Sequence, residues 1–179
     1  MEIIKIHNKN FGLYQDKAAI HGRIQKLGIK ITSDFQGKEL VVIGVLNGAF
    51  IFCADLCREI AIPLEVSFVK ISSYEGTERT GLIKSVIGLN THLEGKNILI
   101  VEDIVDSGTS VNYLISEFLT YNPASISIAT LLFKPEAFRF NYTLDYVGFE
   151  IPNKFVVGYG LDYDGLGRNL PSIYQLETS

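Results

Sequence analysis

The sequence predicts an α/β fold in which helices flank a central, mainly parallel β-sheet. Short apolar runs typical of buried strands alternate with segments whose apolar residues recur at helical spacing. This alternation is characteristic of parallel sheets, because their strands are joined by helical crossovers. The ligands of such sheets bind beyond the carboxyl ends of the strands, so the residues that follow each strand are the candidate site.

Three helices are expected from periodicity. Isoleucine and leucine side chains at 20, 24, 27 and 31 form one face of a helix from about residue 15 to residue 34. A second helix is expected from the turn at 47–49 to about Glu59. The third begins after a Ser-Gly-Thr-Ser sequence, where apolar residues at 111, 114, 115, 118 and 119 fall on one face.

The predicted strands are apolar runs bounded by polar or glycine-containing segments. In chain order they cover residues 2–6, 40–46, 64–71, 83–87, 97–101, 126–133, 146–147 and 155–159. The last forty residues or so are punctuated by Pro152 and several glycines, which predicts a small flap or hood rather than a second domain. We therefore expect one domain over residues 1–179, with a core at about 10–140 and a flap at about 141–179.

Composition narrows the class of partner. A formal net charge of −4 and a pI near 5.4 argue against nucleic acid or an anionic membrane as the main partner. Cys53 and Cys57 lie four residues apart in an apolar stretch without a second pair of ligands, so buried thiols are favoured over a metal site. No segment has the pattern of a signal peptide or a membrane span, and a cytoplasmic location is expected.

The most informative stretch is the acidic, glycine-containing segment between strand 97–101 and the third helix. Amides at the helix N-terminus, with the hydroxyls of Ser107, Thr109 and Ser110, are suited to a phosphate dianion, and Gly108 allows close approach. Glu102 and Asp103 could accept hydrogen bonds from sugar hydroxyls or hold magnesium through water. Asp106 is then left as a proton acceptor. An ordinary capped helix start is the alternative, but two adjacent acids beside an apolar strand cost stability unless something binds them.

This stretch, from Glu102-Asp103 to Asp106-Ser107-Gly108-Thr109-Ser110, resembles the ribose-phosphate signature of the type I phosphoribosyltransferases. Aspartate at position 106 is the version found in the 6-oxopurine, or hypoxanthine-guanine, enzymes. The resemblance implies the type I phosphoribosyltransferase fold with a mobile lid loop. It also implies transfer of the phosphoribosyl group of PRPP to hypoxanthine or guanine, with Mg²⁺ as cofactor and a homodimer or homotetramer as the assembly. Asp106 would take the N7 proton of the base, while Glu102 and Asp103 would hold the ribose hydroxyls and metal.

Two further segments match the pyrophosphate-binding parts of this family. The segment 44–49 is a strand-to-helix turn, and the resemblance implies a cis peptide at Leu46–Asn47 whose amides, with Gly48, face pyrophosphate. Many relatives carry lysine or arginine where this chain has Asn47, so the turn would rely more on its backbone. Residues 72–81 form a mobile hairpin loop by composition, or by resemblance a lid that closes Ser73 and Tyr74 over pyrophosphate.

Two segments match the purine-binding parts. Lys134 directly follows a strand and is either a solvated strand-end lysine or, by resemblance, the donor to the purine O6. In the segment 154–163, Phe155 would stack on the purine and the main chain of Val156 would read its edge. Asp162 would hold a second magnesium through water, and Arg168 would contact pyrophosphate.

Two other functions fit parts of this pattern. One is an RNA-binding attenuator built on a PRPP-binding fold, which would need a basic face. The other is a phosphoribosyltransferase for adenine, orotate or uracil. The acidic net charge opposes the first, and Asp106 with Lys134 opposes the second. The sequence leaves the preference among hypoxanthine, guanine and xanthine open.

Overall fold

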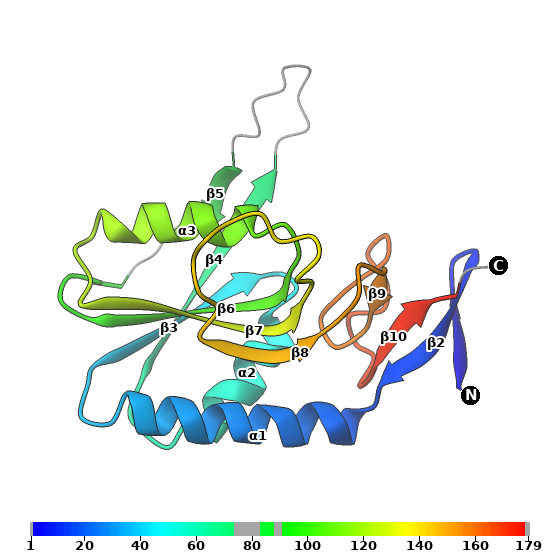
Figure 1. Cartoon of the computed structure of the whole chain (residues 1–179), viewed down its shortest axis with the longest axis horizontal. Coiled ribbons are helices and arrows are strands. Elements are labelled where there is room, and N and C mark those ends of the chain that lie inside the picture. Colours follow the sequence, from blue (N-terminus) through cyan, green and yellow to red (C-terminus); the bar gives the residue numbers. More distant parts are fainter. Residues whose placement is uncertain (1, 74–82, 88–90, 178–179) are drawn as a thin grey trace.

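The computed structural model describes residues 2–73, 83–87 and 91–177. Its larger sheet has six strands in the order β5-β4-β3-β6-β7-β8, and only β5 is antiparallel to its neighbour (Figure 1). These strands are β3 Leu40–Leu46, β4 Glu65–Ser73, β5 Ile83–Ile87, β6 Asn97–Val105, β7 Ser125–Phe133 and β8 Tyr146–Glu150. The predicted mainly parallel α/β sheet is confirmed.

Helices cover both faces of this sheet. The helices α1 (Lys17–Asp34) and α2 (Phe50–Glu59) lie on one face, and α3 (Thr109–Leu119) lies on the other (Figure 1). The apolar face predicted for α1 is buried, and the Asp16 carboxylate caps its start by accepting from the amides of Ala18 and Ala19 at 2.8 Å. Among the described residues, no helix is long and apolar enough to cross a membrane.

The sheet register brings the candidate segments to one edge. Leu46 of β3 pairs with Lys70 of β4, and Val105 of β6 pairs with Phe133 of β7. Residues 47, 106 and 134 therefore follow their strands at the same carboxyl edge. β6 is longer than predicted, because it continues through residues 102–105, so Glu102 and Asp103 are strand residues whose side chains leave opposite faces.

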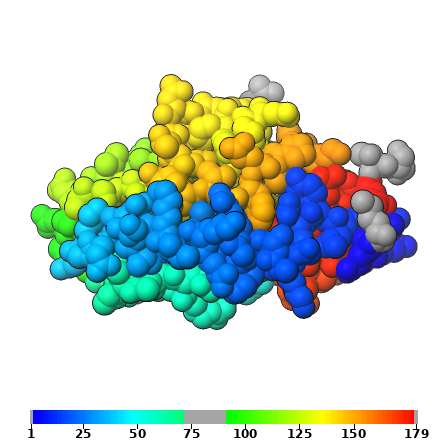
Figure 2. Space-filling model, turned by 60° about the horizontal axis from the view of Figure 1, so that its bottom comes forward, coloured from blue at the N-terminus to red at the C-terminus, as the bar shows by residue number. Residues whose placement is uncertain are grey.

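A second, four-stranded sheet with the order β1-β2-β10-β9 forms the hood at one end of the molecule (Figure 1). Its strands are β1 Ile3–Ile6, β2 Lys9–Gln15, β9 Val156–Val157 and β10 Ile173–Leu176. The sequence predicted a flap from residues 141–179 alone, whereas the hood joins both ends of the chain, which lie side by side in Figure 2. Conversely, β8 belongs to the larger sheet, because its apolar residues pair with β7.

The predicted lid lies between β4 and β5. Ser73 ends β4 and pairs with Ile83 of the antiparallel β5, so the two strands form a hairpin. Tyr74 and the rest of the predicted lid segment, up to residue 81, lie outside the described residues.

Candidate active site

Glu102 and Asp103, the acid pair near the end of β6, have buried carboxylate atoms that are not all hydrogen-bonded within the described part of the chain. The Asp103 side chain is buried, and Glu102 is partly exposed as a residue but its Oε2 is buried without a hydrogen-bond partner among the described residues. Burial, followed by the neighbouring Asp103 carboxylate, raises the pKa of Glu102 well above its usual value. Burial also raises the pKa of Asp103, although the Glu102 side chain, the Ile104 amide and, to a smaller extent, the charge of Arg168 oppose this shift. Such a pair can bind hydroxyl groups or a cation.

The loop after β6 forms a small pocket of about 90 Å³, lined by Glu102, residues 104–106 and residues 107–111. Gly108 is the N-cap of α3 and has φ 84°, a left-handed conformation that favours glycine. The hydroxyls of Ser107 and Thr109 lie 3.0 Å apart at the start of the helix. The pocket thus combines amides at a helix N-terminus with hydroxyl groups, which is the chemistry of a phosphate site.

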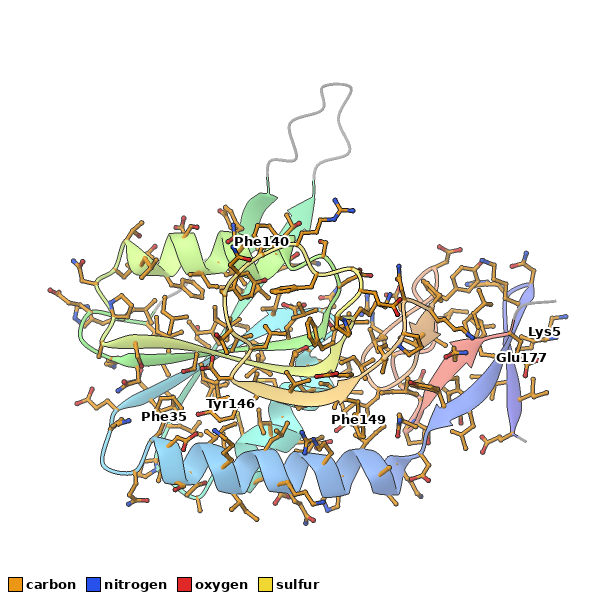
Figure 3. The ribbon with its side chains drawn as sticks, in the orientation of Figure 1. Lys5, Phe35, Phe140, Tyr146, Phe149 and Glu177 are labelled. Atoms are coloured by element: carbon orange, nitrogen blue, oxygen red, sulfur yellow. The ribbon has the colours of Figure 1, made fainter. Side chains whose placement is uncertain are left out.

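Aromatic residues of the β7–β8 connection support this loop, and sequence reasoning missed them. Tyr142 Oη donates to the Gly108 carbonyl at 2.6 Å, and the Arg139 amide donates to the Ser107 carbonyl at 3.2 Å. A Cβ at Gly108 would lie 2.5 Å from Tyr142 Oη and 2.6 Å from the Phe138 ring. Phe140 stacks on Tyr142 with ring centroids 5.8 Å apart and lies on the α3 side of the sheet in Figure 3. No sequence signal marks Tyr142, because its segment is irregular and its partner lies 34 residues away.

A second pocket, of about 220 Å³, adjoins the first and shares Ile104 and Asp106 with it. Its lining contains the residues that the sequence analysis assigned to the base, which are Asp106, Lys134, Phe155 and Val156, with Asp103 and Asp162 assigned to metal and Arg168 assigned to pyrophosphate. Ile104 and Leu161 complete the lining. Lys134 is 8% exposed, and its Nζ lies 2.9 Å from Asp106 Oδ2. Lys134 is therefore not a solvated strand-end lysine: the fold holds a cation beside the candidate proton acceptor.

The hood supplies the aromatic wall of this pocket. Phe155 is 45% exposed, and its ring packs against Tyr163 at 5.8 Å and against Phe11 of β2 at 6.3 Å. Phe11 is fully buried in the hood core and also contacts Tyr163 at 6.0 Å. The exposed ring of Phe155 is thus held in place by the N-terminal strand, which gives a planar ligand a fixed surface.

The turn after β3 meets both the acids and the hood. Its Leu46–Asn47 peptide is cis, as the resemblance implied. A Cβ at Gly48 would overlap the Asp103 carboxylate, and one at Gly160 of the hood would overlap the Gly48 carbonyl. Glycine at these two positions therefore allows the turn, the acid pair and the hood to be in direct contact.

Arg168 and Asp162 are brought together at the same place. Arg168 Nη2 lies 2.6 Å from Asp162 Oδ1, and Nη1 donates to the Gly160 carbonyl at 2.6 Å. Asp162 Oδ2 accepts from the Gly165 amide at 2.7 Å. Both carboxylate oxygens of Asp162 are thus engaged, and the charge of the Arg168 guanidinium also acts on Asp103.

A loop suited to phosphate and a pocket with an aromatic wall lie together at the carboxyl edge of a parallel sheet. This combination indicates the class of protein. The phosphoribosyl transferase domain family model matches residues 13–164, and the chain belongs to this phosphoribosyltransferase family. It has the type I phosphoribosyltransferase fold.

Relatives of the chain carry more specific names. The chain is 45% identical over 161 residues to a hypoxanthine-guanine phosphoribosyltransferase of Bacillus subtilis, covering 89% of each protein. It is 44% identical over 154 residues to a hypoxanthine phosphoribosyltransferase of Buchnera aphidicola, covering 84% of this chain and 87% of the relative. A crystal structure of a Staphylococcus aureus hypoxanthine phosphoribosyltransferase superposes with a TM-score of 0.87 at 39% identity, over 92% of this chain and 90% of that one.

Proposed function

We propose that this protein is a purine-salvage enzyme. It transfers the phosphoribosyl group of PRPP to hypoxanthine or guanine and releases the nucleoside monophosphate and pyrophosphate, with residues 1–179 acting as one domain. The observation that carries the proposal is the pairing of Lys134 with Asp106 at 2.9 Å inside the pocket walled by Phe155. The 6-oxopurine edge carries O6 and N7 side by side, so it needs a donor and a proton acceptor that are neighbours.

Each part of PRPP has a matching group. The 5′-phosphate binds the amides and hydroxyls of residues 107–110, and Glu102 with Asp103 accepts hydrogen bonds from the ribose hydroxyls. The amides of the 46–48 turn and the guanidinium of Arg168 hold pyrophosphate, as do Ser73 and Tyr74 of the lid. Phe155 stacks on the purine, and the main chain of Val156 contacts its edge.

Asp106 moves a proton and Lys134 selects the base. As N9 of the purine attacks C1′ and the bond to pyrophosphate breaks, Asp106 takes the proton from N7. Lys134 donates to O6, which a 6-aminopurine lacks, so adenine leaves the buried cation unsatisfied.

Magnesium fits the acid pair. Glu102 Oε2 is buried without a hydrogen-bond partner among the described residues, and burial raises the pKa values of both acids, so a bound cation would stabilise their charged forms. Among the described residues, no group of three or more acids, histidines or cysteines could hold a metal by itself. We therefore propose that Glu102 and Asp103, and Asp162 through water, hold Mg²⁺ together with the oxygens of PRPP. Bound there, Mg²⁺ neutralises charge on the leaving pyrophosphate.

We also propose that the chain assembles as a homodimer or homotetramer. Phe50 of α2 and Val66 and Phe68 of β4 are 43%, 47% and 37% exposed. Phe68 and Cys53 both approach Gly44, so β4 and α2 present these apolar side chains on the same side of β3. Light scattering of the wild type and of Phe68→Gln would test this assembly, and a monomeric wild type would contradict it.

An ultraviolet assay tests the proposed reaction. PRPP and magnesium are supplied with hypoxanthine, guanine, xanthine or adenine in separate reactions, with EDTA as the metal-free control. Conversion of hypoxanthine or guanine with adenine inert is expected, and EDTA should abolish it. Turnover of adenine, or of no base at all, would contradict the proposal.

A further inference from the structure

One hydrogen bond joins the hood to the helix that follows the pyrophosphate turn. The hydroxyl of Tyr159 donates to the carboxylate of Asp55 on α2, which also pairs with Arg58 one helical turn further on. Tyr159 is 7% exposed and has φ 50°, in a turn closed by hydrogen bonds between Gly158 and Leu161 at 3.0 and 3.1 Å. Neither Tyr159 nor Asp55 lines the two pockets of the candidate site.

The Tyr159 turn carries groups that meet the site directly. Gly160 accepts from Arg168 Nη1 at 2.6 Å, and its amide donates to the Arg168 carbonyl at 2.9 Å. The same Gly160 packs on the Gly48 carbonyl so closely that a Cβ would overlap it. A displacement of this turn therefore moves Arg168 and removes the support beneath the 46–48 turn.

The anchor of Tyr159 is rigidly connected to the other side of the site. Helix α2 begins at Phe50, and the Cys53 amide donates to the Ala49 carbonyl at 2.8 Å, so the helix continues directly from the turn. Asp55 lies in this helix, little more than one turn from its start. One short helix thus holds both the pyrophosphate turn and the acceptor that fixes the hood.

We propose that Asp55 and Tyr159 are positioning residues for the pyrophosphate subsite. Their hydrogen bond fixes the hood turn so that Arg168 and the amides of residues 47 and 48 face one ligand, the pyrophosphoryl group of PRPP or inorganic pyrophosphate. The inference rests on the proposed function for the identity of that ligand. Asn47 offers no side-chain cation, so the subsite depends on the placement of Arg168 and of backbone amides.

Tyr146 provides a matched control within the same chain. Its hydroxyl also donates to an aspartate, Asp34 Oδ2, at 2.8 Å, and its side chain is 4% exposed. Figure 3 shows Tyr146 between β8 and α1, away from the hood. Tyr146→Phe and Tyr159→Phe therefore remove the same chemical group from similarly buried places, but only Tyr159 lies in the turn to which Arg168 is hydrogen-bonded.

The test compares the wild type with the two variants. Calorimetry measures the affinity of each protein for inorganic pyrophosphate in the presence of magnesium, and steady-state kinetics give kcat and KM. For Tyr159→Phe we expect about tenfold weaker pyrophosphate binding and a similar rise in the KM for PRPP, the scale of a hydrogen bond to a charged group. The KM for hypoxanthine and the affinity for IMP should change less than twofold. Tyr146→Phe should lower the melting temperature comparably without changing pyrophosphate affinity.

Two outcomes would overturn the inference. One is a Tyr159→Phe protein that binds pyrophosphate as tightly as the wild type, because the hydrogen bond would then serve stability alone. The other is a wild type that does not bind pyrophosphate. A wild type that binds pyrophosphate but converts no base would contradict the proposed reaction. The comparison of the two variants would still decide whether Tyr159 positions the pyrophosphate subsite. If Tyr159→Phe does not fold, Asp55→Asn retains an acceptor oxygen and should weaken pyrophosphate binding two- to fivefold, and unchanged binding would overturn the inference.

Discussion

The phosphate loop and the hood both line the candidate site but are built in different ways. The phosphate loop, residues 102–110, is one continuous segment that runs from the end of β6 into the first turn of α3, and its hydroxyl contact joins residues two apart in sequence. The hood is assembled from the two ends of the chain, where Leu176 pairs with Phe11 and Tyr174 Oη donates to Glu2 at 2.7 Å.

Because of this difference, we expect the two halves of the site to respond to mutations in different parts of the chain. Groups in the loop are placed by local backbone geometry, so the phosphate-binding half should respond to changes within or beneath residues 102–110. Groups in the hood are placed by long-range strand pairing, so the base-binding half should respond to changes far from the ligand. The predictions below test this division, from the largest expected effect to the smallest.

Asp106→Asn should remove the chemistry while leaving the loop intact. The amide keeps the size of the side chain but cannot take the N7 proton, so kcat should fall about 10²- to 10⁴-fold. PRPP affinity, measured by calorimetry, should change little, because the amides and hydroxyls that we propose as the phosphate ligands remain. Turnover equal to that of the wild type would contradict the proposed role of Asp106.

Gly108→Ala should weaken phosphate binding about tenfold. The new Cβ requires a left-handed conformation and would meet Tyr142 and Phe138, so the loop must shift. Gly95→Ala is the control, because Gly95 has φ 72° and nothing within 4 Å of the added Cβ. If the two variants bind PRPP and IMP equally well, support of the loop by the β7–β8 connection does not matter for affinity.

Phe11→Leu should affect the base rather than the phosphate. Loss of the ring that backs Phe155 should raise the KM for hypoxanthine about threefold and lower stability by about 1 kcal/mol. Phe118→Leu in the α3 core is the control, since Phe118 is 1% exposed and lies outside both pockets. An equal rise in hypoxanthine KM in both variants would mean that general destabilisation, not the hood, causes the effect.

High pH should weaken the two tyrosine–aspartate links gradually. Burial and the neighbouring aspartates raise the pKa values of Tyr146 and Tyr159 above the ordinary value near 10. The unfolded chain therefore releases these protons first, so their contribution to stability is complete below about pH 10 and declines as pH rises further. In urea unfolding from pH 8 to pH 11, Tyr146→Phe and Tyr159→Phe should each show a shallower decline than the wild type. An unchanged decline in either variant would exclude that tyrosine as a cause.

The same division explains which elements could be predicted. The unit of β6, loop and α3 was predicted closely, because an apolar run, turn residues and helical periodicity follow one another within about twenty residues. β2 and β10 were not predicted, since Lys9–Gln15 has little apolar periodicity and its partner strand is about 160 residues away. Tyr142 was missed for the same reason, as its hydrogen bond to Gly108 leaves no local pattern.

The sequence by itself determined the mainly parallel α/β class and the chemistry available at the carboxyl edge of the sheet, because strand and helix periodicity and turn residues act over short distances. The tertiary structure decided how those groups combine. It joined both chain ends into the hood, buried Lys134 beside Asp106 and brought Gly160 onto Gly48. These arrangements depend on burial and on pairing between distant strands, which local preferences do not encode.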